Sequence, residues 1–265
     1  MAQPKRKSTR LDTAVAERSG VTRSRARSLI MAGRVRVDGR PMTKPGTTVA
    51  IDANVEIDRP RPFVSRGGEK LEAALDAFGV DPAGLRALDV GASTGGFTDC
   101  LLRRGAAHVV AVDVGYGQLA VALRDDPRVT VVERTNFRTL PDDAFPDGFD
   151  LIVADVSFIS LATILRRAIG YLREGGTVVA LLKPQFEAGR GRLGGGGVVR
   201  DPEAHREILH EFLAAMSQLE LGVAAAMVSP LRGPAGNVEF LLRIERGGHA
   251  IAERHIERLV EEAHR

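Results

Sequence analysis

Two charged side chains directly follow two short apolar runs of the chain. Asp155 comes after residues 151–154, and Lys183 comes after residues 177–182. Continuous apolar runs of this length predict strands that are buried on both faces of a parallel sheet. In an open sheet of this kind, ligands bind at the carboxyl ends of the strands. We therefore expect Asp155 and Lys183 to meet beside a ligand, where a lysine that has lost its proton acts as a general base.

A second lysine and a second acid are expected at the same edge. Lys70 lies in the first turn of a predicted amphipathic helix over residues 69–78, and Glu239 lies at the start of the last predicted strand. A structural ion pair explains two of the four charges, but it explains less well why all four gather at one edge. Because a neighbouring cation makes a lysine lose its proton more readily, we expect Lys70 to assist Lys183. The two carboxylates would orient the ammonium groups, which suits removal of a proton from a hydroxyl.

A glycine-rich turn follows the first predicted strand, at residues 85–90. It reads Asp89-Val90-Gly91-Ala92-Ser93-Thr94-Gly95-Gly96-Phe97. This Asp-x-Gly-x-x-x-Gly pattern differs from the Gly-x-Gly-x-x-Gly of dinucleotide enzymes, whose helix N-terminus binds a pyrophosphate. S-adenosylmethionine has no phosphate and needs room for an amino-acid moiety and a sulfonium. The turn therefore favours this cofactor, and a glycine-rich turn without a ligand is the alternative.

The second predicted strand ends in an acid, Asp113. An acid at that point contacts ribose hydroxyls in this topology. Tyr116 follows between two glycines and is expected near an adenine ring. The six histidines show no convincing ligand set, so we expect no metal. The predicted cofactor site consists of Asp89, Gly91, Ser93, Thr94, Gly95, Gly96, Phe97, Asp113, Val114, Tyr116, Asn136 and Asp155.

The remaining apolar patterns predict a doubly wound α/β domain behind a small module. Helices are expected near residues 11–20 and 22–33, with a hairpin over residues 34–40. The larger domain is predicted to have strands at 85–90, 107–112, 129–132, 151–154, 177–182, 223–228 and 238–244, and helices at 97–105, 161–172, 202–219 and 251–263. Seven strands with a late hairpin-like pair is the number found in a Rossmann-like methyltransferase.

Positive charge is concentrated at the start of the chain. Residues 1–40 hold eleven Lys or Arg and three acids, whereas the whole chain carries a net charge of only +3. A basic module on a mildly acidic body indicates a polyanionic partner. The arginines expected to bind this polyanion are Arg10, Arg23, Arg25, Arg27, Arg34, Arg36 and Arg66.

Length and composition limit the remaining possibilities. A chain of 265 residues favours one large and one small domain. We expect a module over residues 1–58 that includes a basic tail, a linker over 59–66 that contains two prolines, and a catalytic domain over 67–265. The single cysteine excludes an internal disulfide and suits a reducing cytoplasm. No apolar run approaches the roughly 18 residues that span a bilayer. We therefore expect a cytoplasmic monomer or weak homo-oligomer with no membrane partner.

The basic module resembles the S4 RNA-binding domain. The resemblance rests on Arg10-Leu11-Asp12 and on Ser24-Arg25-x-x-x-Leu29-Ile30-x-x-Gly33-x-Val35-x-Val37-Asp38-Gly39. It covers about 45 residues and implies a small α+β domain that binds structured RNA.

Nearly the whole chain resembles the hemolysin A (TlyA) family of ribosomal RNA 2'-O-methyltransferases, and its catalytic domain is similar to the FtsJ methyltransferases. The matching segments are Val64-Ser65-Arg66-Gly67-Gly68-x-Lys70-Leu71, residues 88–98, residues 112–119, residues 155–161, Lys183-Pro184-Gln185-Phe186-Glu187 and residues 233–239. The resemblance implies a seven-stranded class I methyltransferase domain, S-adenosylmethionine as cofactor and ribosomal RNA or ribosomal subunits as partner. It also implies a cytidine 2'-hydroxyl as acceptor, and it places a Lys-Asp-Lys-Glu catalytic tetrad on Lys70, Asp155, Lys183 and Glu239.

Three classes of alternative remain at this point: a methyltransferase that acts on a base, at C5 or at an exocyclic amine, a non-catalytic RNA-binding factor, and a membrane-lytic protein. A methyltransferase that acts on cytosine C5 needs a cysteine nucleophile, and Cys100 is expected in the core. An enzyme that acts on an exocyclic amine usually has Asn/Asp-Pro-Pro-aromatic where this chain has Asp155-Val156-Ser157-Phe158. A non-catalytic RNA-binding factor in ribosome assembly does not need the four charged residues. A membrane-lytic protein needs a lytic or spanning helix, and the sequence shows neither clearly.

Overall fold

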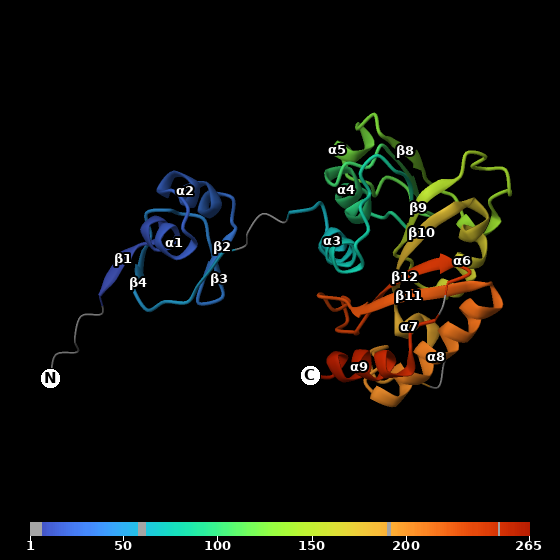
Figure 1. The fold of residues 1–265 in the computed structure, drawn as a ribbon. Coiled ribbons are helices and arrows are strands. Elements are labelled where there is room, and N and C mark those ends of the chain that lie inside the picture. The colour runs from blue at the N-terminus through green and yellow to red at the C-terminus, as the bar shows by residue number, and fades with distance from the viewer. Residues whose placement is uncertain (1–6, 58–61, 190–191, 249) are drawn as a thin grey trace. The chain divides into compact units, whose positions relative to one another are not determined.

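The computed structural model describes residues 7–57, 62–189, 192–248 and 250–265, and it divides the chain into two compact units (Figure 1). The first unit is Met1–Arg61 and the second is Pro62–Arg265. Of the basic tail predicted over residues 1–9, residues 1–6 lie outside the described residues, as do linker residues 59–61, whereas Ser8–Arg10 forms a strand instead of continuing the tail. Phe63, in the remaining part of the predicted linker, belongs to the core of the second unit, and a helix begins at Arg66.

The N-terminal unit packs two helices on short strands. The helices are α1 (Leu11–Ser19) and α2 (Arg23–Met31), and their core includes Leu11, Ile30 and Val35. The strands are β1 (Ser8–Arg10), β2 (Val35–Val37), β3 (Arg40–Met42), β4 (Thr48–Ala50) and β5 (Val55–Ile57). β2 and β3 form the expected hairpin, because Asp38 and Gly39 both adopt the positive φ that such a turn requires. Strands β1, β4 and β5 were not predicted from the sequence.

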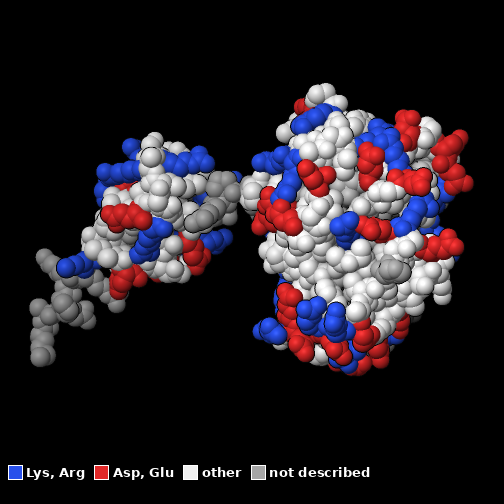
Figure 2. Space-filling model, in the orientation of Figure 1, with Lys and Arg blue, Asp and Glu red and all other residues white. Residues whose placement is uncertain are grey.

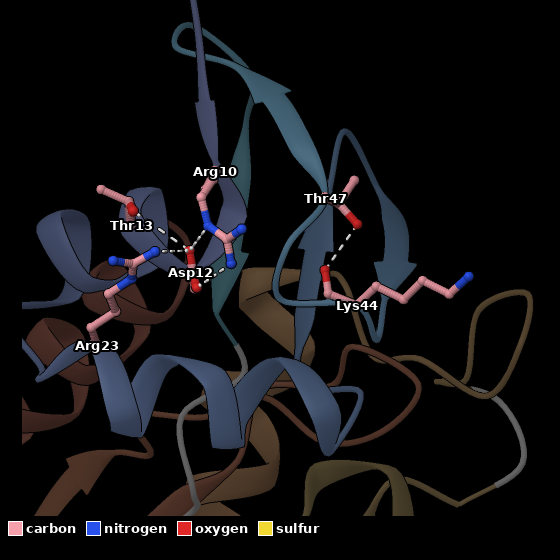
Figure 3. A network of polar contacts seen from close by, with 6 residues as sticks. All are labelled: Arg10, Asp12, Thr13, Arg23, Lys44 and Thr47. Atoms are coloured by element: carbon pink, nitrogen blue, oxygen red, sulfur yellow. Dashed lines mark hydrogen bonds and ion pairs between the residues drawn. The ribbon is translucent and has the colours of Figure 1, made fainter.

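A buried acid connects the beginnings of α1 and α2 (Figure 3). Asp12 is 1% exposed, and its carboxylate accepts hydrogen bonds from Arg10 Nε at 3.0 Å and Arg10 Nη2 at 2.9 Å. Arg23 Nη2 lies 3.3 Å from Asp12 Oδ1. The hydrogen bonds from Arg10, followed by those from Arg23, hold the pKa of Asp12 well below its usual range. Two arginines predicted to bind RNA therefore also stabilise the fold of this unit.

This network predicts how the N-terminal unit responds to acid. Since the pKa of Asp12 is lower in the folded than in the unfolded state, its contribution is fully present above the unfolded pKa of about 3.9 and is lost as the pH falls below it. We expect Asp12→Asn to lower the free energy of unfolding by about 1–2 kcal/mol at pH 7 and to weaken its pH dependence between pH 5 and 3. Hydrogen exchange of residues 8–57 measures both effects. Asp52→Asn, at an exposed acid, is the control, and an unchanged pH dependence in Asp12→Asn would contradict the assignment.

The second unit contains a seven-stranded sheet in the order β11-β12-β10-β9-β6-β7-β8. The strands are β6 (Arg86–Val90), β7 (His108–Val112), β8 (Val129–Val132), β9 (Phe149–Ala154), β10 (Leu172–Leu182), β11 (Leu221–Val228) and β12 (Phe240–Arg246). Strands β6 to β10 run parallel, and β12 runs antiparallel to both β10 and β11. The predicted seven-stranded α/β fold with a late antiparallel pair is confirmed.

Helices cover both faces of this sheet (Figure 1). On one face lie α6 (Leu161–Ala168), α8 (Pro202–Gln218) and α9 (Glu253–Ala263), and on the other lie α3 (Arg66–Phe78), α4 (Gly96–Arg103) and α5 (Val121–Arg124). Neighbouring strand residues face opposite layers: Val110 packs in the first core and Ala111 in the second. Because both faces are buried, the strands read as continuous apolar runs rather than as alternating ones.

Several element boundaries differ from the sequence prediction; β9 begins at Phe149 instead of Leu151, and β10 begins at Leu172 instead of Thr177. The helix predicted to reach Leu172 ends at Ala168, a short 3-10 turn follows at Ile169–Tyr171, and Leu172 begins β10 opposite Phe149. Glu239 precedes β12 instead of starting it. Apolar residues continue across the junction between α6 and β10, and Glu239 lies between Val238 and Phe240, so hydrophobicity alone does not mark either boundary. Among the described residues, no helix is both long and apolar enough to cross a membrane.

Candidate functional site

A cavity of about 390 Å³ opens where the order of the strands reverses. The chain runs from β6 outward to β7 and β8 and then returns to β9 on the other side of β6. The carboxyl ends of β6, β7 and β9 and the loops after them form the walls. Of the predicted cofactor residues, those that line the cavity are Gly91, Ser93, Asp113, Val114, Asn136 and Asp155.

Asp113 fixes the loops at the cavity wall. Its Oδ2 accepts the backbone N–H of Ser93 at 2.8 Å, and its Oδ1 accepts that of Gly115 at 2.7 Å. Each carboxylate oxygen still has a lone pair available for a further donor. Asn136 caps the short 3-10 helix Phe137–Thr139 through its side-chain oxygen, which accepts the N–H of Arg138. Asp113 thus combines a structural role with free acceptor capacity at the cavity.

The glycines of the turn serve different contacts. Gly91 has φ +85°, and a Cβ there would lie 2.8 Å from the backbone oxygen of Asp155. A Cβ on Gly95 would lie 2.3 Å from Leu123 Cδ1, and one on Gly96 would lie 2.2 Å from the Ser65 hydroxyl oxygen. Gly91 therefore brings two cavity-lining loops together, whereas Gly95 and Gly96 let the turn pack against α5 and the start of α3.

The other predicted cofactor residues do not line the cavity. Asp89 is fully buried, and its Oδ2 accepts the backbone N–H and the hydroxyl of Thr98. Its Oδ1 has no hydrogen-bond partner among the described residues, and burial raises the pKa of Asp89 to about 7. Phe97 belongs to the core. Tyr116 is 67% exposed and lies under the guanidinium of Arg134, 3.9 Å from its ring centre. Thr94 likewise lies outside the cavity lining.

The close contact at Gly91 predicts a specific loss of stability. Gly91→Ala adds both a strained backbone and a clash with the Asp155 carbonyl. Gly84 has φ +74°, but no atom lies within 4 Å of a Cβ built there. We expect urea denaturation to show that Gly91→Ala lowers the free energy of unfolding by about 1–3 kcal/mol. The loss should exceed that in Gly84→Ala, where only the backbone conformation is strained. Equal losses of unfolding free energy in the two variants would show that the close approach to the Asp155 carbonyl does not require a glycine at position 91.

Three of the four charged residues predicted from the sequence come from one edge of the sheet. Strands β9 and β10 are parallel neighbours, so Asp155 and Lys183 follow them at the same edge. Because β12 is antiparallel to β10, with Phe240 opposite Leu182, Glu239 lies at that edge too. Lys70 reaches Glu239 from the second turn of α3.

The four side chains form two ion pairs. Lys183 Nζ lies 2.6 Å from Asp155 Oδ1 and donates a hydrogen bond to the Ser157 hydroxyl at 2.8 Å. Lys70 Nζ is paired with Glu239 Oε2. The Lys70 and Glu239 side chains are 8% and 1% exposed, whereas those of Lys183 and Asp155 are 11% and 24% exposed. The Lys183–Asp155 pair is thus the more open of the two, and its carboxylate lines the cavity.

Further residues at the site were not predicted from the sequence. Ser157 contacts Lys183, and Gln118 lines the cavity and accepts the Ser93 hydroxyl. Phe158 also lines the cavity, is 91% exposed and has φ +64°, which is rare for an aromatic residue. Its ring lies 5.0 Å from that of Phe186. From the sequence alone, an aromatic residue after a strand is expected to lie in the core. The exposure of Phe158 therefore became visible only in the structure.

The predicted RNA-binding arginines are exposed. Arg25, Arg27 and Arg34 lie on α2 or just after it, and Figure 2 shows Lys and Arg gathered over the face of the unit that carries α2 in Figure 1. Arg36 donates to the Gly39 carbonyl, and Arg66 is exposed at the start of α3 in the second unit. The basic surface of the first unit therefore centres on α2.

Comparison with known proteins identifies both units. The FtsJ-like methyltransferase family model matches residues 63–246, and the S4 domain model matches residues 9–55. The chain is 51% identical to the 16S/23S rRNA (cytidine-2'-O)-methyltransferase TlyA of Mycobacterium tuberculosis, over 85% of each chain. It is 40% identical to hemolysin A of Brachyspira hyodysenteriae, over 83% of this chain and 92% of that protein. The solved structure of a putative hemolysin from Streptococcus thermophilus is 38% identical, with a TM-score of 0.75, and the alignment covers 98% of this chain and 96% of that one.

Proposed function

The chain belongs to the FtsJ-like methyltransferase family and carries an S4 domain, and we propose that it transfers a methyl group from S-adenosylmethionine to a cytidine 2'-hydroxyl of ribosomal RNA. The observation that carries this proposal is the pairing of Lys183 with Asp155 at the cavity wall. The substrate class is supported by the similarity to TlyA of M. tuberculosis and to the 23S rRNA (cytidine-2'-O)-methyltransferase TlyA of Campylobacter jejuni, which is 35% identical over 67% of this chain and 69% of that protein.

The cavity fits S-adenosylmethionine in volume and in chemistry. Its volume of about 390 Å³ lies within the range of small-molecule sites. Val114 and Ile159 supply apolar walls for an adenine ring, and Asp113 has acceptor capacity for ribose hydroxyls. The carboxylate of Asp155 also lines the cavity, although its charge is balanced by Lys183. When bound, the cofactor supplies an electrophilic methyl group on its sulfonium.

Lys183 is the proposed general base. A ribose hydroxyl is a weak acid, so its proton must leave as the oxygen attacks the methyl group. In its neutral form Lys183 Nζ accepts that proton, while Asp155 and Ser157 orient the nitrogen. The charge of Lys70 is balanced by Glu239, so its effect as a neighbouring cation is weaker than for an unpaired lysine. We therefore propose that the Lys70–Glu239 pair orients the acceptor ribose, because correct alignment of oxygen, methyl and sulfur contributes much of the rate.

The exposed ring of Phe158 at the cavity favours an acceptor nucleotide that is unpaired, outside an RNA helix. RNA-binding proteins commonly recognise unpaired bases by stacking them on aromatic side chains. Phe158 offers an exposed ring beside the cavity and close to the Lys183 segment. The same side chain suits a methyltransferase that acts on a base, so the acceptor atom must be decided by other residues.

The structure offers no thiolate for methylation at cytosine C5. Cys100 is fully buried in α4, and burial raises its pKa to about 12. A thiol in that environment stays protonated and has no access to a substrate. The proposal of a ribose acceptor is therefore favoured over a C5 acceptor.

Replacing the proposed base tests the reaction. We expect Lys183→Met to bind S-adenosylmethionine and ribosomal RNA within about threefold of the wild type and to transfer methyl groups about 10²–10⁴-fold more slowly, since general bases contribute effects of that size. Calorimetry measures cofactor binding, and single-turnover transfer of labelled methyl groups measures the rate. As a substrate control, an RNA with one 2'-deoxy residue at the acceptor position should bind and not react. Methyl transfer to that RNA would show that the base is the acceptor.

The exposed arginines of α2 test the role of the first unit. We expect Arg25→Gln, Arg27→Gln and Arg34→Gln together to weaken RNA binding and to reduce the dependence of log K on log salt by about 2–3, because each lost phosphate contact removes about 0.7–0.9 from that slope. Cofactor binding should not change. The matched control is Arg254→Gln with Arg258→Gln on α9. A wild-type salt slope in the triple variant would exclude this surface as the RNA contact.

A further inference from the structure

Glu187 is a half-buried acid close to Lys183 that the proposed reaction does not use. It ends the short helix α7 (Pro184–Glu187), which follows Lys183 directly. Its Oε1 accepts the backbone N–H of Leu161, the first residue of α6, at 2.6 Å. Ser160 occupies the N-cap position of α6 but makes no side-chain capping hydrogen bond. The cap of α6 is therefore supplied from a separate part of the chain.

This cap closes a connection between two segments. We call residues 155–161 the β9 loop and residues 183–187 the lysine segment. Near their strands the two are joined by Lys183, which contacts Asp155 at 2.6 Å and Ser157 at 2.8 Å. Glu187 joins their far ends through Leu161. Between these ends, the aromatic rings of Phe158 and Phe186 lie 5.0 Å apart.

The β9 loop needs such fixation because its backbone is strained. Phe158 has φ +64°, a conformation that costs free energy for any residue with a Cβ. Strain of this kind persists only where the surrounding structure holds it. The loop is held before Phe158 by the contacts of Lys183 and after Phe158 by Glu187. Loss of the Glu187 contact would leave the loop free to relax from one end.

We propose that Glu187 is a positioning residue for Lys183: by capping α6 it holds the β9 loop in the conformation in which Asp155 and Ser157 orient Lys183 Nζ. This inference rests on the proposed role of Lys183 as the base. Burial raises the pKa of Glu187, opposed by hydrogen bonds from the Leu161 N–H and the Ser160 hydroxyl. Both the charged and the neutral carboxyl group have an oxygen that accepts the Leu161 N–H, so the position requires an acceptor rather than a charge.

Two substitutions in the full-length protein separate these properties. Glu187→Gln keeps an acceptor oxygen at the same reach, and Glu187→Leu removes it. We expect Glu187→Leu to lower kcat for methyl transfer to ribosomal RNA about tenfold or more, with KM for the cofactor and for the RNA within about twofold. Its kcat should also shift in pH dependence, because the contacts of the base change. Glu187→Gln should retain kcat within about threefold of the wild type.

A helix cap elsewhere in the same unit provides the control. Asp201 caps α8, where its Oδ1 accepts the N–H of Glu203 at 3.0 Å, and it does not line the cavity. Asp201→Ala should lower Tm to an extent comparable with Glu187→Leu and leave kcat unchanged. If Glu187→Leu does not fold, Glu187→Asp replaces it, since the shorter side chain keeps the charge but does not reach Leu161. A loss of kcat without a change in KM is then expected of that variant.

The outcomes distinguish this inference from the proposed function. Wild-type kcat in Glu187→Leu, equal losses in the Gln and Leu variants, or an equal loss in Asp201→Ala would each overturn the positioning role. Full activity of Lys183→Met would instead overturn the proposed base, whatever the Glu187 variants do. Dependence on Lys183 together with full activity of Glu187→Leu overturns the positioning role alone.

Discussion

The ion pair between Lys183 and Asp155 depends on the neighbouring, parallel placement of β9 and β10. Each residue directly follows its strand, so the register of the two strands decides whether the two side chains meet. β12 joins the same edge from the opposite direction and brings Glu239 within reach of Lys70. The charged site is thus a consequence of strand order: a different neighbour for β10 would leave Lys183 without its carboxylate.

The two ion pairs differ in the freedom of their lysines. Both side chains of the Lys70–Glu239 pair are almost fully buried, and a buried pair that loses one partner leaves a costly unpaired charge. Lys70 is therefore held in place by its partner. Lys183 pairs with a carboxylate that lines the cavity, and it has a neutral hydroxyl, Ser157, as its second partner. In the proposed reaction, Asp155 and Ser157 would orient the nitrogen of Lys183.

The loops at the cavity are held by close backbone contacts and by carboxylates. Gly91 lets the turn after β6 approach the Asp155 carbonyl, Asp113 binds two backbone N–H groups, and Glu187 caps α6. Each contact joins segments that follow different strands. Such contacts restrict the movement of the polar groups at the site, and pre-orientation of polar groups is a large contribution that a protein makes to reactions that develop charge.

The sequence by itself determined the seven-stranded α/β fold, the basic N-terminal module and the charged residues at the strand ends, because apolar periodicity and the residues that end each run are local properties. Only the tertiary structure decided that Lys183 pairs with Asp155 and Lys70 with Glu239, that Gly95 and Gly96 serve packing, and that Asp89 and Phe97 lie away from the cavity. The same holds for the exposure of Phe158 and for the hydrogen bond by which Glu187 caps α6. These features depend on which distant segments become neighbours in the fold, and that cannot be predicted from residue type and spacing within one segment.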